Sequence, residues 1–339
     1  MNVNALNAVA KAMVGNGRGI LAADESSPTI KKRFDTIAVE STEENRRRYR
    51  EMLCTAPGIA EYIGGVILFD ETIRQSTSVG VPFPKYLNDQ GMVAGIKVDK
   101  GAKPLAAFPG ELITEGLDGL RDRFKEYHAM GAHFAKWRAV INIGDGIPTD
   151  FCLEANAHAL ARYAALAQEA MLVPIVEPEV LMDGSHSIER CEEVTTKTLR
   201  LVFQALEAHR VELPGIVLKP NMVISGTDAP DRAGPQDVAE ATLRVLKAQV
   251  PAEVPGIAFL SGGQSAEEAT EHLAVMNRMG PLPWELSFSY GRALQAPSLQ
   301  AWRGHEAQFK AGQDALFKRA KLNSLAHLGK YDTGMETAV

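Results

Sequence analysis

Several short apolar segments carry charged side chains at positions that share one face of a strand. Lys136 and Arg138 are two residues apart in FAKWRAV, as are Glu177 and Glu179 in IVEPEV, and Lys219 comes near the end of GIVLKP; residues two apart point to the same face of a strand. Burial and a neighbouring cation both disfavour an ammonium group, so a lysine here is expected to have a depressed pKa. A neutral amine attacks carbonyls to form a Schiff base. Lys136 and Lys219 are alternative nucleophiles on these grounds.

Further ionisable residues lie at the ends of neighbouring apolar segments. Lys97 and Asp99 share a face in GIKVD, Asp24 ends the first segment and Arg292 follows the last. A single such charge could belong to an ion pair at a solvated strand end. Burying so many charges without a use would be costly, so together they predict one site. Its carboxylates could move the protons that Schiff-base chemistry requires.

Two glycine- and serine-containing segments predict a phosphate site. LSGGQS contains Ser261, Gly262 and Gly263, and FSYGRA contains Ser289 and Arg292. The glycines would let backbone N–H groups approach an anion, the serines can donate hydroxyls, and arginine binds phosphate in a forked geometry. Loops after the last two strands of a barrel are a frequent place for such a site.

The segments that carry these residues recur through the chain. Eight short apolar runs begin near Ile20, Val66, Val93, Phe134, Val173, Ile216, Ile257 and Leu286. Most of the intervals hold one stretch with helical periodicity, which is typical of βα units that build a parallel sheet. The complete count predicts a single-domain (β/α)8 TIM barrel over residues 1–339, with barrel strands in about 19–292 and C-terminal helices and a short tail in 296–339.

Local signals predict where some helices begin and end. Ser41 with Glu44, and Ser265 with Glu268, have capping-box spacing and predict two helix starts. Leu117, Leu120, Phe124 and Tyr127 share a face of a helix expected within 116–131, and Gly131 can provide its left-handed end. Closing helices are expected from Pro297 to about Leu328.

Composition excludes several classes of protein. The 339 residues are 45% hydrophobic and 23% charged with a net charge of −6, so a disordered chain is excluded and no basic field for nucleic acid is expected. No apolar run approaches the length of a membrane span, and the N-terminus lacks a basic leader. Three scattered cysteines fit a reduced, cytoplasmic protein. The eight histidines lack metal-binding spacing, and His186 is expected in a surface loop.

These motifs resemble the class I, Schiff-base-forming fructose-bisphosphate aldolases. The similar segments span most of the chain in family order: GILAADES, TEENRRRYR, GGVILFDET, GIKVDKG, FAKWR, PIVEPE, LKPNMV, FLSGGQS, FSYGRALQ, and NSLA with GKY. The resemblance implies reversible cleavage of fructose 1,6-bisphosphate to dihydroxyacetone phosphate and glyceraldehyde 3-phosphate. It also implies no cofactor, no metal, a small-molecule phosphosugar substrate and a cytoplasmic homotetramer.

The resemblance assigns catalytic roles residue by residue. Lys219, from its place in LKPNM, resembles the family's Schiff-base lysine, and Lys136 of FAKWR the lysine that assists proton exchange around carbinolamine formation and dehydration. Glu177 corresponds to the carboxylate that relays protons and takes the C4 hydroxyl proton, with Glu179 tuning the lysines. Asp24 corresponds to the residue that holds the reacting hydroxyls.

The resemblance also assigns substrate contacts. Near the C1 phosphate these are Ser261, Gly262, Ser289, Gly291 and Arg292. Gly263 is expected there as well, because a glycine lets backbone N–H groups approach an anion. Near the other phosphate they are Ser26, Thr29 and Lys97, and Arg33 and Glu25 lie close to it. Arg138, the second charged residue of FAKWR, is also expected to contact the substrate.

Two departures from the family pattern limit this assignment. This chain has DESSPT where many members have DESTGS, so Pro28 stiffens that loop and removes an N–H. Animal members continue to a terminal tyrosine that assists proton exchange, whereas only eight residues follow Tyr331 here. Competing interpretations are another Schiff-base phosphosugar aldolase or transaldolase, a zinc-dependent class II aldolase, and a non-catalytic phosphosugar-binding scaffold.

Overall fold

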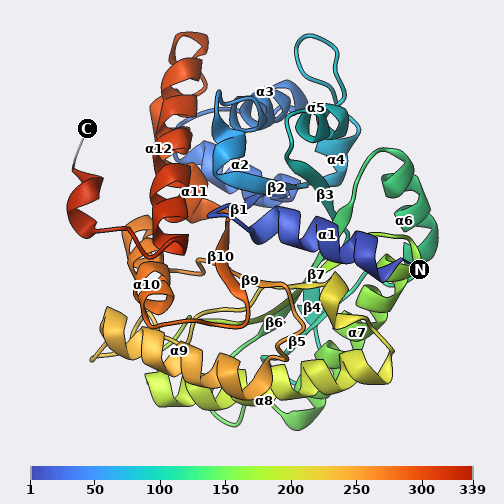
Figure 1. The fold of residues 1–339 in the computed structure, drawn as a ribbon, viewed down its shortest axis with the longest axis vertical. Helices are drawn as coiled ribbons and strands as arrows, with labels where there is room; N and C mark the ends of the chain where they lie inside the picture. Colours follow the sequence, from blue (N-terminus) through green and yellow to red (C-terminus); the bar gives the residue numbers. More distant parts are fainter. Residues whose placement is uncertain (1, 338–339) are drawn as a thin grey trace.

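Eight parallel strands form a closed barrel in the computed structural model, which describes residues 2–337 (Figure 1). Around the barrel the strands follow the order β1, β10, β9, β8, β7, β6, β3, β2. Their bounds are β1 Gly19–Ala23, β2 Ile63–Leu68, β3 Val93–Lys97, β6 Phe134–Ile141, β7 Val173–Val180, β8 Val217–Leu218, β9 Gly256–Phe259 and β10 Glu285–Tyr290. Each contains or adjoins one of the eight apolar runs, so the predicted (β/α)8 barrel is confirmed.

Helices surround this barrel, and all but the first lie around its outer face (Figure 1). Their bounds are α1 Val3–Val14, α2 Ser27–Asp35, α3 Glu43–Cys54, α4 Asp70–Ile73, α5 Phe83–Asp89, α6 Leu120–Ala129, α7 Asp150–Glu169, α8 Ile188–Ala208, α9 Pro235–Gln249, α10 Ala266–Arg278, α11 Arg292–Trp302 and α12 Phe309–His327. Short 3-10 turns occupy Ile59–Glu61, Leu213–Gly215, Glu306–Gln308 and Thr333–Glu336. None of the helices in residues 2–337 combines the length and the apolar character needed to cross a bilayer.

Helix α1 closes the end of the barrel at which the strands begin. Its residues Met13 and Val14 are fully buried and share a cluster with barrel-lining side chains such as Phe134. The fit requires glycine on the strands: a Cβ on Gly64 would lie 2.5 Å from the Met13 carbonyl oxygen, and one on Gly256 would lie 2.4 Å from Val14. With this end covered, the opposite end of the barrel is left for a site.

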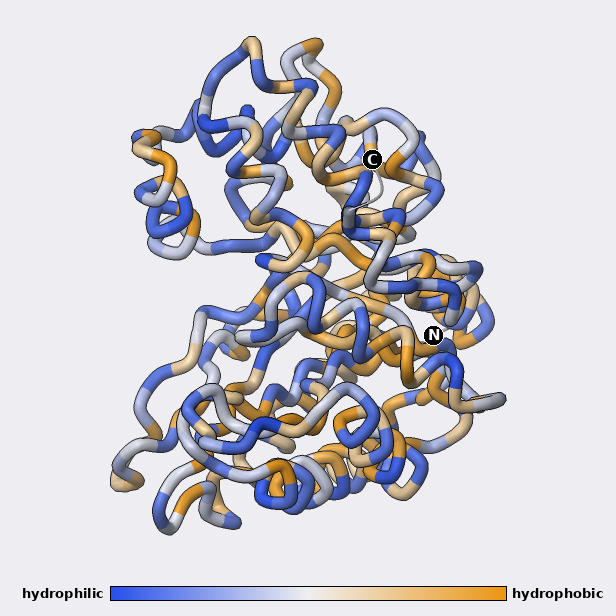
Figure 2. Tube along the Cα trace, turned by 90° about the vertical axis from the view of Figure 1, so that its left-hand side faces the viewer, coloured by the Kyte–Doolittle hydropathy of each residue, from blue (hydrophilic) through white to orange (hydrophobic). Residues whose placement is uncertain are grey.

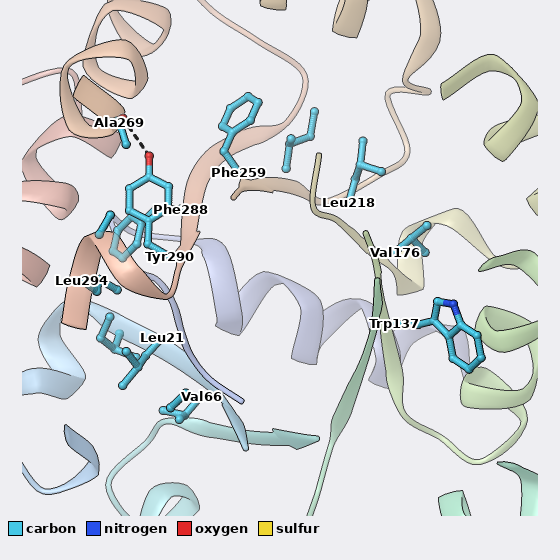
Figure 3. Packing of buried hydrophobic residues seen from close by; sticks show 14 of the residues in the cluster. Leu21, Val66, Trp137, Val176, Leu218, Phe259, Ala269, Phe288, Tyr290 and Leu294 are labelled. Carbon is cyan, nitrogen blue, oxygen red and sulfur yellow. Dashed lines mark hydrogen bonds between the residues drawn. The ribbon is translucent and has the colours of Figure 1, made fainter. Parts of the chain in front are cut away.

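The alternation of side chains along each strand separates the core from the charged interior. Trp137 of β6, Val176 of β7 and Phe259 of β9 point away from the barrel axis toward the helices (Figure 3), and Trp137 stacks on Tyr163 of α7 with ring centroids 5.6 Å apart. Because successive residues face opposite sides, Lys136 must point inward. Hydrophobic stretches run through the middle of the molecule, while hydrophilic residues dominate its outer loops (Figure 2).

Several predicted boundaries need correction. The capping box of Ser265 and Glu268 is confirmed at the start of α10, but the N-cap of α3 is Thr42 and not Ser41. Helix α6 begins at Leu120, after Leu117. Helix α11 begins at Arg292, with Pro297 inside it, and not at the proline. An antiparallel hairpin of β4 (Ala102–Pro104) and β5 (Leu112–Thr114) was not predicted, because its strands are three residues long and largely exposed or half-buried.

Candidate active site

A cavity of about 610 Å³ lies where the barrel strands end. It brings together all the predicted site residues except Gly263 and Asp99. Those that line it are Asp24, Ser26, Thr29, Arg33, Lys97, Lys136, Arg138, Glu177, Glu179, Lys219, Ser261, Gly262, Ser289, Gly291 and Arg292. Gly263 instead packs on Met182, whose sulfur accepts its N–H and would lie 2.8 Å from an added Cβ.

Two lysines and two carboxylates form a connected group at the centre of the cavity. The Lys219 Nζ lies 3.1 Å from Glu177 Oε1, and the Lys136 Nζ lies 3.3 Å from Glu177 Oε2 and 2.7 Å from Asp24 Oδ2. Lys219, Glu177 and Lys136 are all buried. The β6–β7 register pairs Lys136 with Ile175 and Arg138 with Glu177, so Glu177 lies two residues beyond the partner of Lys136 and on the same face of the sheet. Glu177 therefore connects the two candidate nucleophiles.

The charges in this group correct the expectation of a depressed lysine pKa at Lys136. Burial acts to lower the pKa of Lys136, but Asp24, Glu177 and Asp99 outweigh it, and the pKa is raised. Burial likewise acts to raise the pKa of Asp24, yet Lys136, Lys219 and Lys97 hold it well below its usual range. The prediction from the sequence considered only burial and the neighbouring cation, both of which lower the lysine pKa. The carboxylates from other strands raise the pKa by more than this. The raised pKa keeps Lys136 as an ammonium group, and in that form it cannot attack a carbonyl.

A second ion pair borders this group. Glu179 of β7 accepts from Arg138 Nε of β6. Burial acts to lower the pKa of Arg138, but Glu179 and Glu177 raise it further above its ordinary value. Lys97 at the end of β3 lies 3.6 Å from Asp99. Each of these two cations is therefore paired with a carboxylate at the border of the central group.

One end of the cavity is formed by the loops that follow β9 and β10. Arg292, the first residue of α11, donates to the Gly262 carbonyl at 3.0 Å, which ties the two loops together. Gly262 has a φ of +56°, a conformation that favours glycine. The hydroxyl of Ser289 is buried and has no hydrogen-bond partner among residues 2–337. An unpaired hydroxyl beside an arginine suits a phosphate oxygen.

Helix α2 contributes the other wall of the cavity. Ser26 is its N-cap residue but makes no side-chain cap, and its hydroxyl lies 3.1 Å from that of Thr29. Pro28 occupies the first turn of the helix, where a missing N–H costs no intrahelical hydrogen bond. Ser26 and Thr29 both line the cavity, and Pro28 fits the start of the helix.

Sequence reasoning missed a residue that supports this wall. Gln295 of α11 donates to the Ala22 carbonyl at 2.6 Å and to Glu25 at 2.8 Å, and its Oε1 accepts from Tyr49 and Arg33. It belongs to FSYGRALQ and lies three residues after Arg292, so helical spacing could have found it. The cavity also extends between α2 and α11, where it is lined by Lys32, Thr36, Ala296, Leu299 and Gln300.

His186 and Tyr331 do not line the cavity. His186 is half-buried, and neither of its ring nitrogens has a partner among residues 2–337. Tyr331 is buried, and its hydroxyl donates to Glu336 at 2.8 Å. Within residues 2–337 no group of three or more His, Cys, Asp and Glu side chains is arranged to hold a metal ion.

Comparisons with known proteins agree in pointing to one family. The family model described as "Fructose-bisphosphate aldolase class-I" matches residues 5–339. "Probable fructose-bisphosphate aldolase class 1" of Xylella fastidiosa is 58% identical over 98% of this chain and 99% of the relative, and "Fructose-bisphosphate aldolase B" of Gallus gallus is 52% identical over 98% and 92%. A solved aldolase of Plasmodium falciparum, in complex with TRAP and a small-molecule inhibitor, superposes with a TM-score of 0.96 at 49% identity and covers 97% of this chain and 96% of its own. The chain therefore belongs to the class I fructose-bisphosphate aldolase family.

Proposed function

We propose that Lys219 forms the Schiff base in the reaction of this family. As a class I fructose-bisphosphate aldolase, the protein is a lyase that reversibly cleaves fructose 1,6-bisphosphate to dihydroxyacetone phosphate and glyceraldehyde 3-phosphate. The observation that carries the assignment to Lys219 is its position. It is buried, lines the cavity and lies 3.1 Å from Glu177, whereas Lys136 is paired with two carboxylates that keep it charged.

The two ends of the cavity would hold the two phosphates. Ser261, Gly262, Ser289, Gly291 and Arg292 would bind the C1 phosphate. Ser26, Thr29 and Lys97 would bind the other, with Arg33 close by. Anchoring both ends fixes the scissile bond beside Lys219, so binding energy from the phosphates positions the reacting atoms.

The central group would then move the protons. The Lys219 amine adds to the C2 carbonyl, and loss of water from the carbinolamine gives a protonated iminium, with Lys136 as proton donor and Glu177 as relay. Glu177 next takes the C4 hydroxyl proton, the C3–C4 electron pair moves into the iminium, and glyceraldehyde 3-phosphate leaves. Protonation of the resulting enamine and hydrolysis release dihydroxyacetone phosphate. Asp24 holds the reacting hydroxyls and Glu179 orients Arg138.

Substitution of each lysine tests the assignment. Lys219→Met removes the amine with little change in volume, so we expect fructose 1,6-bisphosphate cleavage to disappear while the circular dichroism spectrum is unchanged. Lys136→Met is the matched variant: it should slow cleavage and still accumulate a borohydride-reducible adduct. Retention of cleavage in Lys219→Met would overturn the proposal.

The remaining expectations concern assembly and location. We propose that the protein is a cytoplasmic homotetramer, on the strength of its resemblance to the family. Sedimentation velocity of the purified protein tests the tetramer, and a purely monomeric species would contradict it. Cell fractionation tests the location.

A further inference from the structure

A proline interrupts the backbone hydrogen bonding between the strands that deliver Glu177 and Lys219. The β7–β8 register pairs Ile175 with Val217 and Val176 with Leu218, which sets Lys219 opposite Glu177. The Lys219 N–H donates to the Val176 carbonyl at 2.8 Å. In a parallel ladder the backbone N–H of residue 178 would donate to the Lys219 carbonyl, but Pro178 has no N–H. The backbone of Pro220 faces β9 instead, and β8 ends at Leu218.

The side chain of Asn221 reconnects the two strands beyond this gap. Its Oδ1 accepts from the Val180 N–H of β7 at 3.0 Å, where a ladder would place a backbone carbonyl. Its Nδ2 donates to the Met222 carbonyl at 3.0 Å and to the Thr195 hydroxyl of α8 at 3.1 Å. Asn221 is only 5% exposed, so water does not compete for these hydrogen bonds.

We propose that Asn221 is a positioning residue that sets the separation of Lys219 and Glu177. The inference rests on the proposed function, because it concerns the distance between the nucleophile and its proton relay. The segment after Lys219 turns away to β9, where the Pro220 carbonyl accepts from Leu260 at 3.1 Å. The Asn221 side chain therefore links this segment to Val180 of β7, which lies one residue beyond Glu179. Loss of that link would let Lys219 move relative to Glu177, and a shift of about 1 Å can cost roughly a hundredfold in rate.

The test compares Asn221→Ala with a matched control, Asn156→Ala. Asn156 of α7 is also buried, and its Nδ2 donates to the carbonyls of Leu112 and Cys152 at 2.8 and 3.0 Å, but it does not line the cavity. We expect both variants to melt at lower temperature. Asn221→Ala alone should lose roughly tenfold to a hundredfold in kcat, with KM for fructose 1,6-bisphosphate within about twofold of wild type. Rapid quenching into borohydride with dihydroxyacetone phosphate should show iminium formation slowed by the same factor.

A second variant keeps the test decisive if Asn221→Ala does not fold. Thr195→Val is a nearly isosteric change at a residue that does not line the cavity. It removes the hydroxyl that accepts from the Asn221 amide, so it should give a smaller fall in kcat in the same direction. Wild-type kcat and iminium formation in the folded variants, with only a lower melting temperature, would overturn the proposal and leave Asn221 a structural residue. Cleavage by Lys219→Met would instead refute the proposed function, so the two failures are distinguishable.

Discussion

Acidification should loosen the phosphate loop through one buried histidine. His272 of α10 lies within hydrogen-bonding distance of the Gln264 side chain, with Nδ1 2.6 Å from Oε1, and Gln264 donates to the Ser261 carbonyl at 3.1 Å. His272 is 6% exposed. Burial lowers its pKa to about 4, opposed by Glu268 and assisted by Arg232. The neutral ring can donate its Nδ1 proton to Gln264 and so hold the loop in place.

The size of the effect follows from proton linkage. The ordinary pKa of the ring is 6.5 and the folded value is about 4, so the unfolded chain binds more protons between these values. Stability is therefore intact above pH 6.5 and falls as the pH decreases through this window. At pH 5 the loss attributable to His272 is about 2 kcal/mol, approaching a limit of about 3 kcal/mol below pH 4.

Denaturant unfolding of wild type and His272→Gln at pH 7.5 and pH 5 measures this contribution. Glutamine does not titrate, so the variant should lose about 2 kcal/mol less than wild type between the two pH values. Other groups titrate in both proteins, and their contributions cancel in the comparison. An equal loss in the two proteins would refute the reasoning.

Two further predictions concern the tail and the phosphate site. Removal of residues 332–339, the last two of which lie outside the described part of the chain, should leave turnover close to wild type. It should also lower the unfolding free energy by about 3 kcal/mol, because Glu336 pairs with the buried Arg319 and accepts from Tyr331. Calorimetry measures the stability, and a large selective loss of proton exchange would contradict the prediction for turnover. Arg292→Ala should raise KM for fructose 1,6-bisphosphate roughly tenfold or more through loss of a charge-assisted hydrogen bond; an unchanged KM in steady-state kinetics would contradict its assignment to the phosphate.

The barrel and the composition of its mouth could be predicted because both depend on local patterns. Eight apolar runs predict eight strands, and residues two apart, such as Lys136 with Arg138, must share a face. Strand ends converge in a parallel barrel, so the charges could be grouped without knowing any distance. The N-cap of α3 was misplaced by one residue because Ser41 and Thr42 are both good capping residues.

Features that depend on contacts between distant segments could not be predicted. The pKa of Lys136 depends on Asp24, which lies 112 residues earlier in the sequence and only 2.7 Å away in the fold. Helical spacing from Arg292 could have marked Gln295 as a candidate, but its partners Ala22, Glu25 and Tyr49 lie on segments that no local pattern connects to it. The hydrogen bond between Asn221 and Val180 is equally nonlocal, although Pro178 signals in the sequence that the ladder is interrupted.

Borohydride reduction in the presence of dihydroxyacetone phosphate, followed by peptide mapping, tests the central claim most directly. Reduction converts a transient iminium into a stable secondary amine on whichever lysine formed it. We predict stoichiometric labelling of Lys219 and none of Lys136. Labelling of Lys136 or of another lysine, or no covalent adduct in an active preparation, would contradict the account.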